Sequence, residues 1–176
     1  TKMPQALIEK AKELVEQANS IPDTDPKFAA LLGIVQETNA RENNKIILFS
    51  GFRHTLGYLL PKLHALGLRV AQVDGSVSSE DRLRIRKRFK LPRTDANAYD
   101  MLLFTEVGSE GLDYQFCDTI VNYDLPWNPM RIEQRIGRID RRGQKSDVVH
   151  IYNMITDDTV DADIYARCLM RIGVFE

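Results

Sequence analysis

Lys45-Ile46-Ile47-Leu48-Phe49-Ser50-Gly51 is the stretch that decides the fold. A short run of branched and aromatic apolar residues follows Asn43-Asn44 and ends at a serine and a glycine. Such a run is typical of a strand that is buried on both faces, as strands of parallel sheets are. The sequence around it is therefore expected to supply neighbouring strands and the helices that cover them.

Strand and helix patterns alternate on both sides of this run. Further strands are predicted at 69–73, 101–105, 119–123 and 148–154. Helices are predicted at 4–19, 26–42, 53–66, 78–90, 130–141 and 160–171. This alternation predicts one α/β domain, a mainly parallel sheet covered by helices on both faces.

Composition places the chain among ordinary soluble domains. Its 176 residues suit one domain, and the net charge of −1 does not by itself indicate nucleic acid, although local patches matter more than the sum. Cys117 and Cys168 lack metal-ligand spacing, so neither a zinc site nor a disulfide framework is predicted. With no apolar run of membrane length, we expect a cytoplasmic protein, and the start at Thr1 suggests a piece of a longer one.

Polar or glycine-bearing loops follow four of the predicted strands. Ligands of parallel sheets bind at the carboxyl ends of the strands. The loops in question are Ser50-Gly51, Gly75-Ser76, Thr105 to Asp113, and Asp124 to Pro129. We therefore expect the functional edge of the sheet to be the one at the carboxyl ends of its strands.

The predicted helix over 130–141 concentrates its arginines. At about 100° per residue, Gln134, Arg138 and Arg141 share one face. The opposite face carries three isoleucines: Ile132, Ile136 and Ile139. Arginine suits phosphate oxygens because it is always charged and forked. The alternative is a solvated structural face with Asp140 as a local ion-pair partner.

The chemistry needed to hydrolyse a nucleotide is incomplete. A P-loop requires a lysine after its second glycine, but Tyr58 follows the segment from Gly51 to Gly57. Asp124 ends a strand as a magnesium ligand would, yet Leu125 follows where a glutamate would be useful. We therefore predict no metal site and no hydrolysis by this chain alone. Arg138 and Arg141 instead resemble arginine fingers, which serve a site built elsewhere.

Three segments together resemble motifs of superfamily-two helicases. Gln134 to Arg141 resembles motif VI, Thr105 to Asp113 motif V, and Ile46 to Arg53 motif IV. Trp127-Asn128-Pro129 and the later Arg141 to Gln144 resemble the Swi/Snf-like branch, and the longer run is most similar to RapA-like members. Two residues, Asp113 and Asp140, depart from the pattern of the eukaryotic remodellers and favour RapA-like or general helicase members.

This resemblance implies a RecA-like three-layer α/β/α fold. Residues 43–176 would form the helicase C-terminal lobe, and residues 1–42 a helical lead-in packed on it. ATP and Mg²⁺ would be held mainly by a first RecA-like lobe, with Arg138 and Arg141 reaching the γ-phosphate. The other implied nucleotide contacts are Gly111, Asp113 and Gln134.

The resemblance also implies contacts with nucleic acid along the same edge, which Gly75 joins by its position. The expected residues are Ser50, Gly51, Arg53, Gly75, Thr105 and Trp127. Two alternatives stay open: Thr105 as a simple strand end, and Trp127 as a packed loop aromatic. The basic run from Arg82 to Arg93 fits a solvated face and a phosphate-tracking surface equally well.

The sequence thus favours the second motor lobe of an ATP-dependent translocase on double-stranded DNA. Expected partners are the first lobe of the same protein, double-stranded DNA, and RNA polymerase or another protein; no membrane is expected. Localisation would be cytoplasmic, at a bacterial or archaeal nucleoid. The alternatives are a lobe of an RNA or duplex-unwinding helicase and a non-catalytic RecA-like interaction domain.

Overall fold

The computed structural model describes residues 4–20, 25–106, 108, 113–156, 159, 162–163 and 165–166. Its helices are α1 (Gln5–Ser20), α2 (Pro26–Asn39), α3 (Arg53–Ala65), α4 (Ser79–Lys90) and α5 (Pro129–Ile136). Its strands are β1 (Ile46–Phe49), β2 (Val70–Val73), β3 (Met101–Phe104), β4 (Thr119–Asn122) and β5 (His150–Asn153). Each strand overlaps a predicted one, so the alternating pattern is confirmed.

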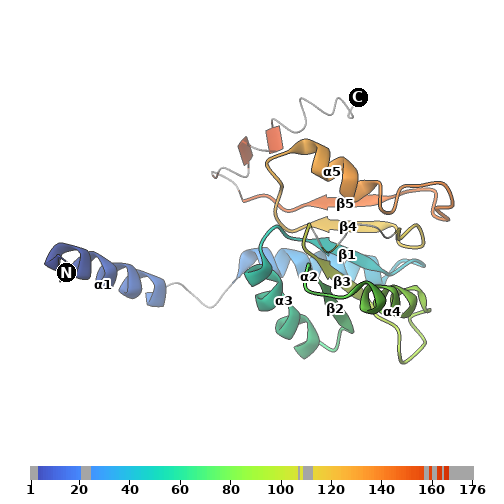
Figure 1. Ribbon diagram of the computed structural model, residues 1–176, viewed down its shortest axis with the longest axis horizontal. Helices are drawn as coiled ribbons and strands as arrows, with labels where there is room; N and C mark the ends of the chain where they lie inside the picture. Colours follow the sequence, from blue (N-terminus) through green and yellow to red (C-terminus); the bar gives the residue numbers. More distant parts are fainter. Residues whose placement is uncertain are drawn as a thin grey trace.

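The described strands form one parallel sheet in the order β2-β3-β1-β4-β5 (Figure 1). β1 is central and pairs in parallel with β3 on one side and β4 on the other. Phe49, at the end of β1, lies beside Phe104 and Asn122, so these three strands end at the same level. The loops that follow them therefore meet at one edge, as the sequence predicts.

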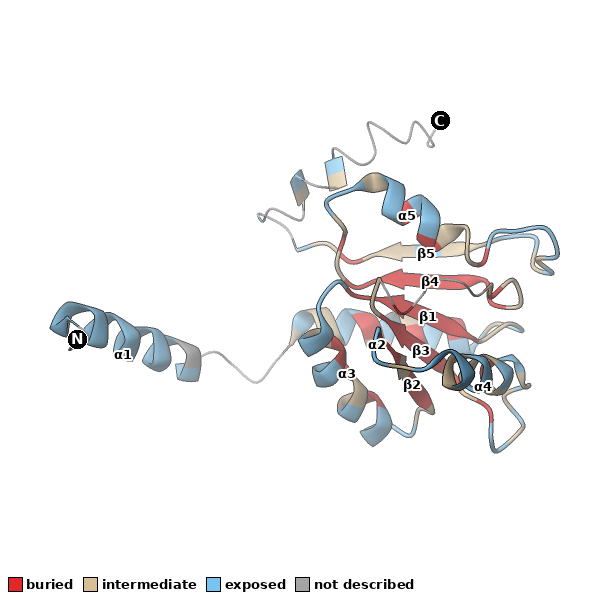
Figure 2. Ribbon diagram, in the orientation of Figure 1, coloured by how far each residue is buried: buried red, intermediate tan, exposed pale blue. Residues whose placement is uncertain are grey.

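Alternate residues of β1 supply two separate cores. Ile46 and Leu48 pack with residues of α2 and α3 on one face of the sheet. Ile47 and Phe49 pack with Phe89 of α4 on the other face. Figure 2 shows the buried strands between exposed outer helix surfaces. Helices on both faces confirm the three-layer α/β/α fold.

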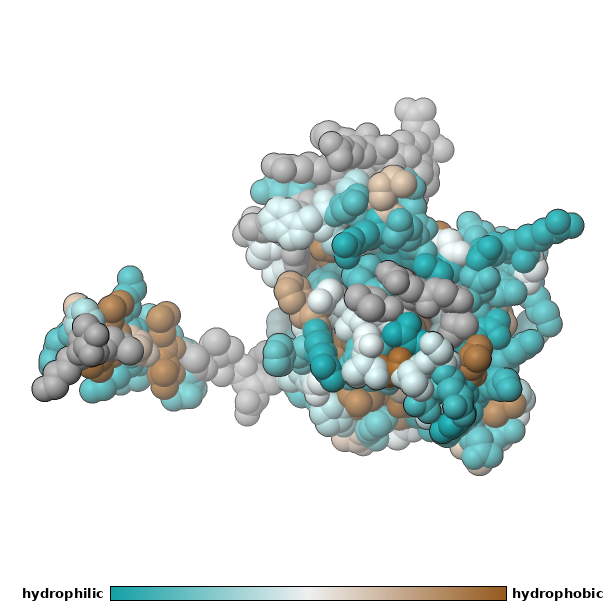
Figure 3. Space-filling model, in the orientation of Figure 1, coloured by the Kyte–Doolittle hydropathy of each residue, from teal (hydrophilic) through white to brown (hydrophobic). Residues whose placement is uncertain are grey.

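The two N-terminal helices differ in their contacts. In α2, Leu31 and Val35 are buried in the core, and Asp25 caps the helix by accepting a hydrogen bond from the Phe28 N–H. In α1 no residue whose burial is described is buried, and Leu14 is 59% exposed. Figure 3 shows apolar side chains on the visible face of α1. The packed part of the expected lead-in is thus α2, and the boundary at 42/43 stays a prediction.

The arginine helix is shorter than predicted. α5 begins after Asn128, whose side chain accepts a hydrogen bond from the Met130 N–H, and ends at Ile136 instead of Arg141. Ile132 packs on Leu125 beside the sheet, whereas Ile139 is buried in the core on the sheet itself. The chain turns between them, so the predicted common face of Gln134, Arg138 and Arg141 does not form as one helix face.

Two further findings concern the rest of the chain. The predicted closing helix over 160–171 lies mostly outside the described residues. Within the part of the chain that the structure describes, no helix is long and apolar enough to cross a membrane.

Candidate functional site

The ends of β1 and β4 are joined by one carboxylate. Asp124 accepts a hydrogen bond from the Gly51 N–H at 2.7 Å through Oδ1 and another from the Ser50 hydroxyl through Oδ2. Ser50 Oγ in turn accepts the N–H of Phe52 at 3.1 Å. Ser50 and Gly51, predicted as nucleic-acid contacts, therefore lie at the expected edge, where Asp124 fixes their backbone.

This pairing gives Asp124 a structural task. Both of its carboxylate oxygens already accept hydrogen bonds within the chain. Over the described residues, no group of three or more His, Cys, Asp or Glu side chains could hold a metal ion. Among the described residues of this edge, the donor set therefore does not fit Mg²⁺ by itself.

Asp74 organises the loop after β2. Its carboxylate accepts hydrogen bonds from the hydroxyl and the N–H of Ser76, and these bonds lower the pKa of the carboxyl. Arg53, whose side chain is 69% exposed, places its Nε 3.1 Å from Asp74 Oδ2. Gly75 is exposed on this turn. Arg53 and Gly75 thus lie together at the functional edge, with the guanidinium open to solvent.

Thr105 lies in a crowded turn after β3. Its N–H donates to the carbonyl of Val73, and its hydroxyl accepts the Gly108 N–H at 3.3 Å. A Cβ on Gly108 would lie 1.9 Å from the Val73 carbonyl oxygen, so only glycine fits there. Thr105 is half-buried at the predicted edge, and its hydroxyl helps to form the turn. Gly111, the other predicted residue of this segment, lies outside the described residues.

Arg135 is the residue that the sequence did not single out. Its side chain is 2% exposed, and its Nη1 donates to Asn122 Oδ1 at 2.7 Å. Its Nε donates to Glu106 Oε1 at 2.9 Å, and its guanidinium lies over the Phe49 ring, 5.1 Å from the centroid. In sequence it is one arginine among several; only its place beside Ile132 on the inward side of α5 could have indicated burial.

The two predicted arginine fingers lie in the turn after α5. Arg138 is half-buried, and its carbonyl accepts the Tyr114 N–H at 2.8 Å. Arg141 forms an ion pair with Asp113, which was predicted to approach the ribose. Gln134 is exposed on α5. The structure thus brings Arg141 and Asp113 into contact, and places Arg138 one backbone hydrogen bond from the residue after Asp113.

Two exposed aromatic side chains line one cavity at this edge. Trp127, in the loop before α5, is 77% exposed, and Phe52 is 66% exposed. Both line a cavity of about 560 Å³ together with Arg131 and Arg135. Phe52 occupies the N-cap position of α3 without a side-chain capping bond, where polar residues are preferred. Trp127 is therefore not a packed core aromatic in the described structure.

Three arginines of the basic helix α4 bond to backbone carbonyls of the protein, whereas Arg84 is 66% exposed beside Glu80. Arg82 donates to the carbonyls of Val77 and Asp74. Arg86 donates to the carbonyl of Asp113 at 2.7 Å, and Arg88 donates to Asn97. The guanidiniums of Arg82, Arg86 and Arg88 therefore stabilise loops. The choice between a solvated face and a phosphate-tracking surface stays open for the helix.

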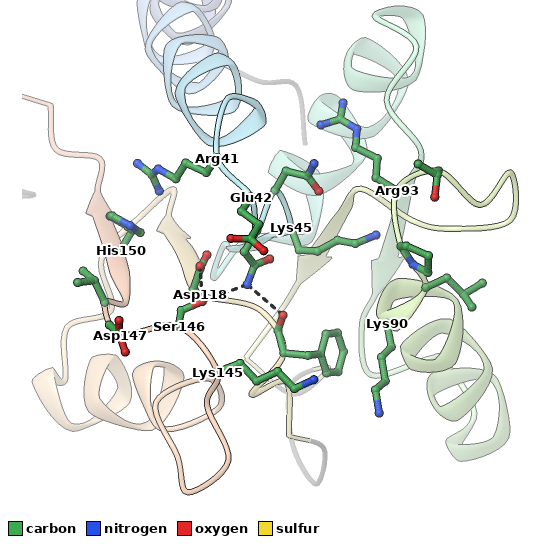
Figure 4. A pocket seen from close by; sticks show the side chains of 17 residues that line it. Arg41, Glu42, Lys45, Lys90, Arg93, Asp118, Lys145, Ser146, Asp147 and His150 are labelled. Atoms are coloured by element: carbon green, nitrogen blue, oxygen red, sulfur yellow. Dashed lines mark hydrogen bonds between the residues drawn. The ribbon is translucent and has the colours of Figure 1, made fainter.

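A second cavity lies at the opposite edge of the sheet, before β1, β4 and β5 begin (Figure 4). Lys45 and Asp118 are buried there. Lys45 donates to the carbonyl of Tyr99, and burial lowers the pKa of its amine. Asp118 accepts from the Ser146 hydroxyl at 2.7 Å. Lys45 and Asp118 thus already have hydrogen-bond partners within the chain, and the carboxyl edge is the stronger candidate site.

The match to a known family identifies the kind of domain to which this edge belongs. The family described as the helicase conserved C-terminal domain matches residues 26–143, which include α2, strands β1 to β4 and the arginine turn. The chain belongs to this helicase family. Its resemblance to superfamily-two helicases is confirmed, while the narrower resemblance to RapA-like members stays a prediction.

Relatives of this helicase domain are much longer proteins. The chain is 40% identical over 134 residues to the ATP-dependent helicase YqhH of Bacillus subtilis, covering 76% of this chain and 23% of YqhH. It is 31% identical over 134 residues to snf21, a chromatin structure-remodeling complex subunit of Schizosaccharomyces pombe, covering 76% and 11%. The chain therefore spans less than a quarter of either relative.

A solved structure confirms the RecA-like fold of the helicase domain. The C-terminal part of the Fun30 ATPase domain superposes with a TM-score of 0.72 at 22% identity. The match covers 90% of this chain and 53% of that chain. At this identity the similarity concerns the fold.

Proposed function

We propose that this helicase domain is the second motor lobe of an ATP-dependent translocase on double-stranded DNA. The observation that carries the proposal is the position of Arg138 and Arg141. They lie in the turn after α5, which the buried Ile139 fixes to the sheet and which contacts Asp113 and Tyr114 in the loop after β3. Arg141 is half-exposed, so the first RecA-like lobe closing on this side would meet both guanidiniums.

The arginines suit the phosphates of an ATP molecule held by that first lobe. When bound to the first lobe, ATP would supply the phosphoryl group for hydrolysis, and its Mg²⁺ would supply positive charge beside the phosphates. Arg138 and Arg141 would stabilise the negative charge that develops on the γ-phosphate during transfer. Gln134, which is exposed on α5, and Asp113 would contact the same nucleotide.

The nucleic-acid grip would use the loops that follow β1, β2 and β3 and the loop before α5. Arg53 offers an exposed guanidinium for a backbone phosphate, and Thr105 a hydroxyl. Trp127 offers an exposed ring for a groove. Contacts of this kind position a protein on the backbone without reading sequence, so binding would be non-specific and sensitive to salt.

Replacement of the arginines in the full-length protein tests the proposal. Arg138→Ala or Arg141→Ala should lower kcat for ATP hydrolysis by about 10³-fold, the scale of an arginine finger. Arg142→Ala, an exposed neighbour in the same turn, is the matched control and should retain activity. Unchanged hydrolysis in both finger variants would favour a non-catalytic interaction domain.

The choice of nucleic acid needs its own measurement. ATP hydrolysis by the full-length protein should be stimulated more by double-stranded DNA than by single-stranded DNA or RNA. The names of YqhH and snf21 support a helicase or a remodelling subunit. Stronger stimulation by RNA would replace the proposal by the RNA-helicase alternative. We likewise propose a contact with RNA polymerase or another protein, and a location at the nucleoid.

A further inference from the structure

Arg135 lies where four elements of the functional edge meet. From α5 its guanidinium donates to Glu106 after β3, to the Asn122 side chain in β4 and to the carbonyl of Asp124 after β4. The face of the guanidinium covers Phe49 at the end of β1. One buried cation thus links the carboxyl ends of three neighbouring strands to the helix that leads into the arginine turn.

We infer that Arg135 is a positioning residue that couples the nucleic-acid contact at Thr105 to the arginine fingers. The inference rests on the proposed function, because it gives Thr105 and Arg138 their roles. It adds the physical link between them, which runs through the ion pair of Arg135 with Glu106. Arg135, whose side chain is 2% exposed, is assigned no contact with ATP or DNA and would act through its neighbours.

The link to nucleic acid begins at Glu106, which directly follows Thr105 in the chain. Glu106 Oε1 accepts from Arg135 Nε at 2.9 Å, and Oε2 lies 3.9 Å from Arg131 Nη1. Two guanidiniums one helical turn apart on α5 therefore hold the same carboxylate. Any displacement of the backbone at Thr105 by a bound phosphate would move the carboxylate to which α5 is fastened.

The link to the fingers runs through the end of α5. The carbonyl of Arg135 accepts the Arg138 N–H at 3.1 Å, which begins the turn. Ile139 is fully buried on the sheet, and the Arg138 carbonyl accepts the Tyr114 N–H. The short turn is thus fixed at both ends, so a shift of α5 reaches Arg138 without being absorbed by a flexible joint.

Burial makes the ion pair stiff enough for this task. Glu106 is 23% exposed and Arg135 only 2%, so water cannot readily replace their contacts. The guanidinium is planar, and its donors point in fixed directions, so it holds Glu106 and Asn122 at a set angle. A lysine ammonium would keep the charge but lose this geometry. The charge and the geometry can therefore be removed separately.

The test compares DNA stimulation in variants of the full-length protein, using linear double-stranded DNA as the probe. Glu106→Gln removes the charge, Arg135→Lys removes the fork, and Val35→Ala, in the core under α2, lowers stability without touching α5 or the ion pair. The ratio of DNA-stimulated to basal kcat should fall at least about fivefold in the first two variants, the lower end for coupled sites. Val35→Ala should keep the wild-type ratio, even where its thermal stability falls as much as that of the other two variants.

Each outcome has one meaning. An unchanged ratio in Glu106→Gln and Arg135→Lys would overturn the inference, as would an equal loss of the ratio in Val35→Ala, which would indicate a merely structural role. If Arg135→Lys does not fold, Glu106→Gln decides alone. A wild-type protein whose hydrolysis ignores DNA would instead refute the proposed function, and this inference with it.

Discussion

Asp113 and Arg141, for which the sequence predicts separate contacts to the ribose and the γ-phosphate, form an ion pair with each other. The side chains of both are partly exposed, at 38% and 51%. An exposed pair of this kind contributes little to stability, because water and ions compete for both partners. The pair therefore holds Arg141 near its site while leaving it free to exchange Asp113 for a phosphate.

The first prediction concerns this exchange. Asp113→Asn should lower the free energy of unfolding by less than about 1 kcal/mol, the usual limit for an exposed pair. In the full-length protein the same change should raise KM for ATP, since an oxygen predicted to contact the ribose loses its charge. Urea denaturation and steady-state hydrolysis measure the two effects. A large loss of stability with KM unchanged would make Asp113 a structural residue instead.

A second prediction compares two glycines. Gly108→Ala would place a Cβ 1.9 Å from the Val73 carbonyl oxygen, so the turn beside Thr105 must shift. We expect a loss of about 1–3 kcal/mol, the range for overpacked sites. Gly57→Ala is the control: it is exposed in the interior of α3 with nothing within 4 Å, and alanine should stabilise the helix by up to about 1 kcal/mol. Thermal denaturation distinguishes the two, and a tolerated Gly108→Ala would contradict the close approach.

A third prediction concerns acid stability. Burial by itself raises the pKa of Asp100, but hydrogen bonds from the Arg69 backbone and guanidinium outweigh it, and the pKa is lowered below its usual value of 3.8. A carboxyl with a lowered pKa contributes stability above its unfolded-state pKa, and this stability is lost as the pH falls through the folded-state pKa. Asp100→Asn should cost about 3 kcal/mol at pH 7, because Arg69 keeps a charge without its partner.

The measurement is the unfolding free energy from pH 7 down to pH 2. Wild-type stability should fall below about pH 4, and this fall should be smaller in Asp100→Asn. Glu80→Gln is the control, since the carboxylate of Glu80 is 87% exposed beside Arg84, and its profile should follow that of the wild type. Equal acid sensitivity of Asp100→Asn and the wild type would assign the effect to other carboxyls.

The sequence predicts the sheet because its strands carry a strong local signal. Each short apolar run, such as 46–49 or 101–104, must be buried whatever its neighbours are. Their parallel direction fits the long connections between them, most of which contain a helix. The functional edge was predictable for the same reason, since loops such as Ser50-Gly51 follow the ends of strands.

The arginine turn was harder to predict because its structure depends on distant contacts. The 3.6-residue pattern of isoleucines continues past Ile136, but Ile132 and Ile139 pack in different clusters, and the helix gives way between them. In the sequence, little distinguishes Arg135 from the exposed arginines around it. Its burial depends on Glu106 and Asn122, which are brought to it only by the folded sheet.

The last prediction concerns Trp127, for which the sequence left a packed aromatic and a DNA contact open. Because its side chain is 77% exposed, Trp127→Ala should leave the unfolding free energy nearly unchanged, as most surface substitutions do. If the ring contacts the DNA groove, the affinity of the full-length protein for double-stranded DNA should fall about fivefold or more, which corresponds to a contact of about 1 kcal/mol or above. Leu66→Ala, a 55% exposed apolar residue just after α3, serves as the control and should keep the wild-type affinity. Fluorescence anisotropy at fixed salt measures binding. A loss of stability with normal DNA affinity would indicate that Trp127 is a packed loop aromatic instead.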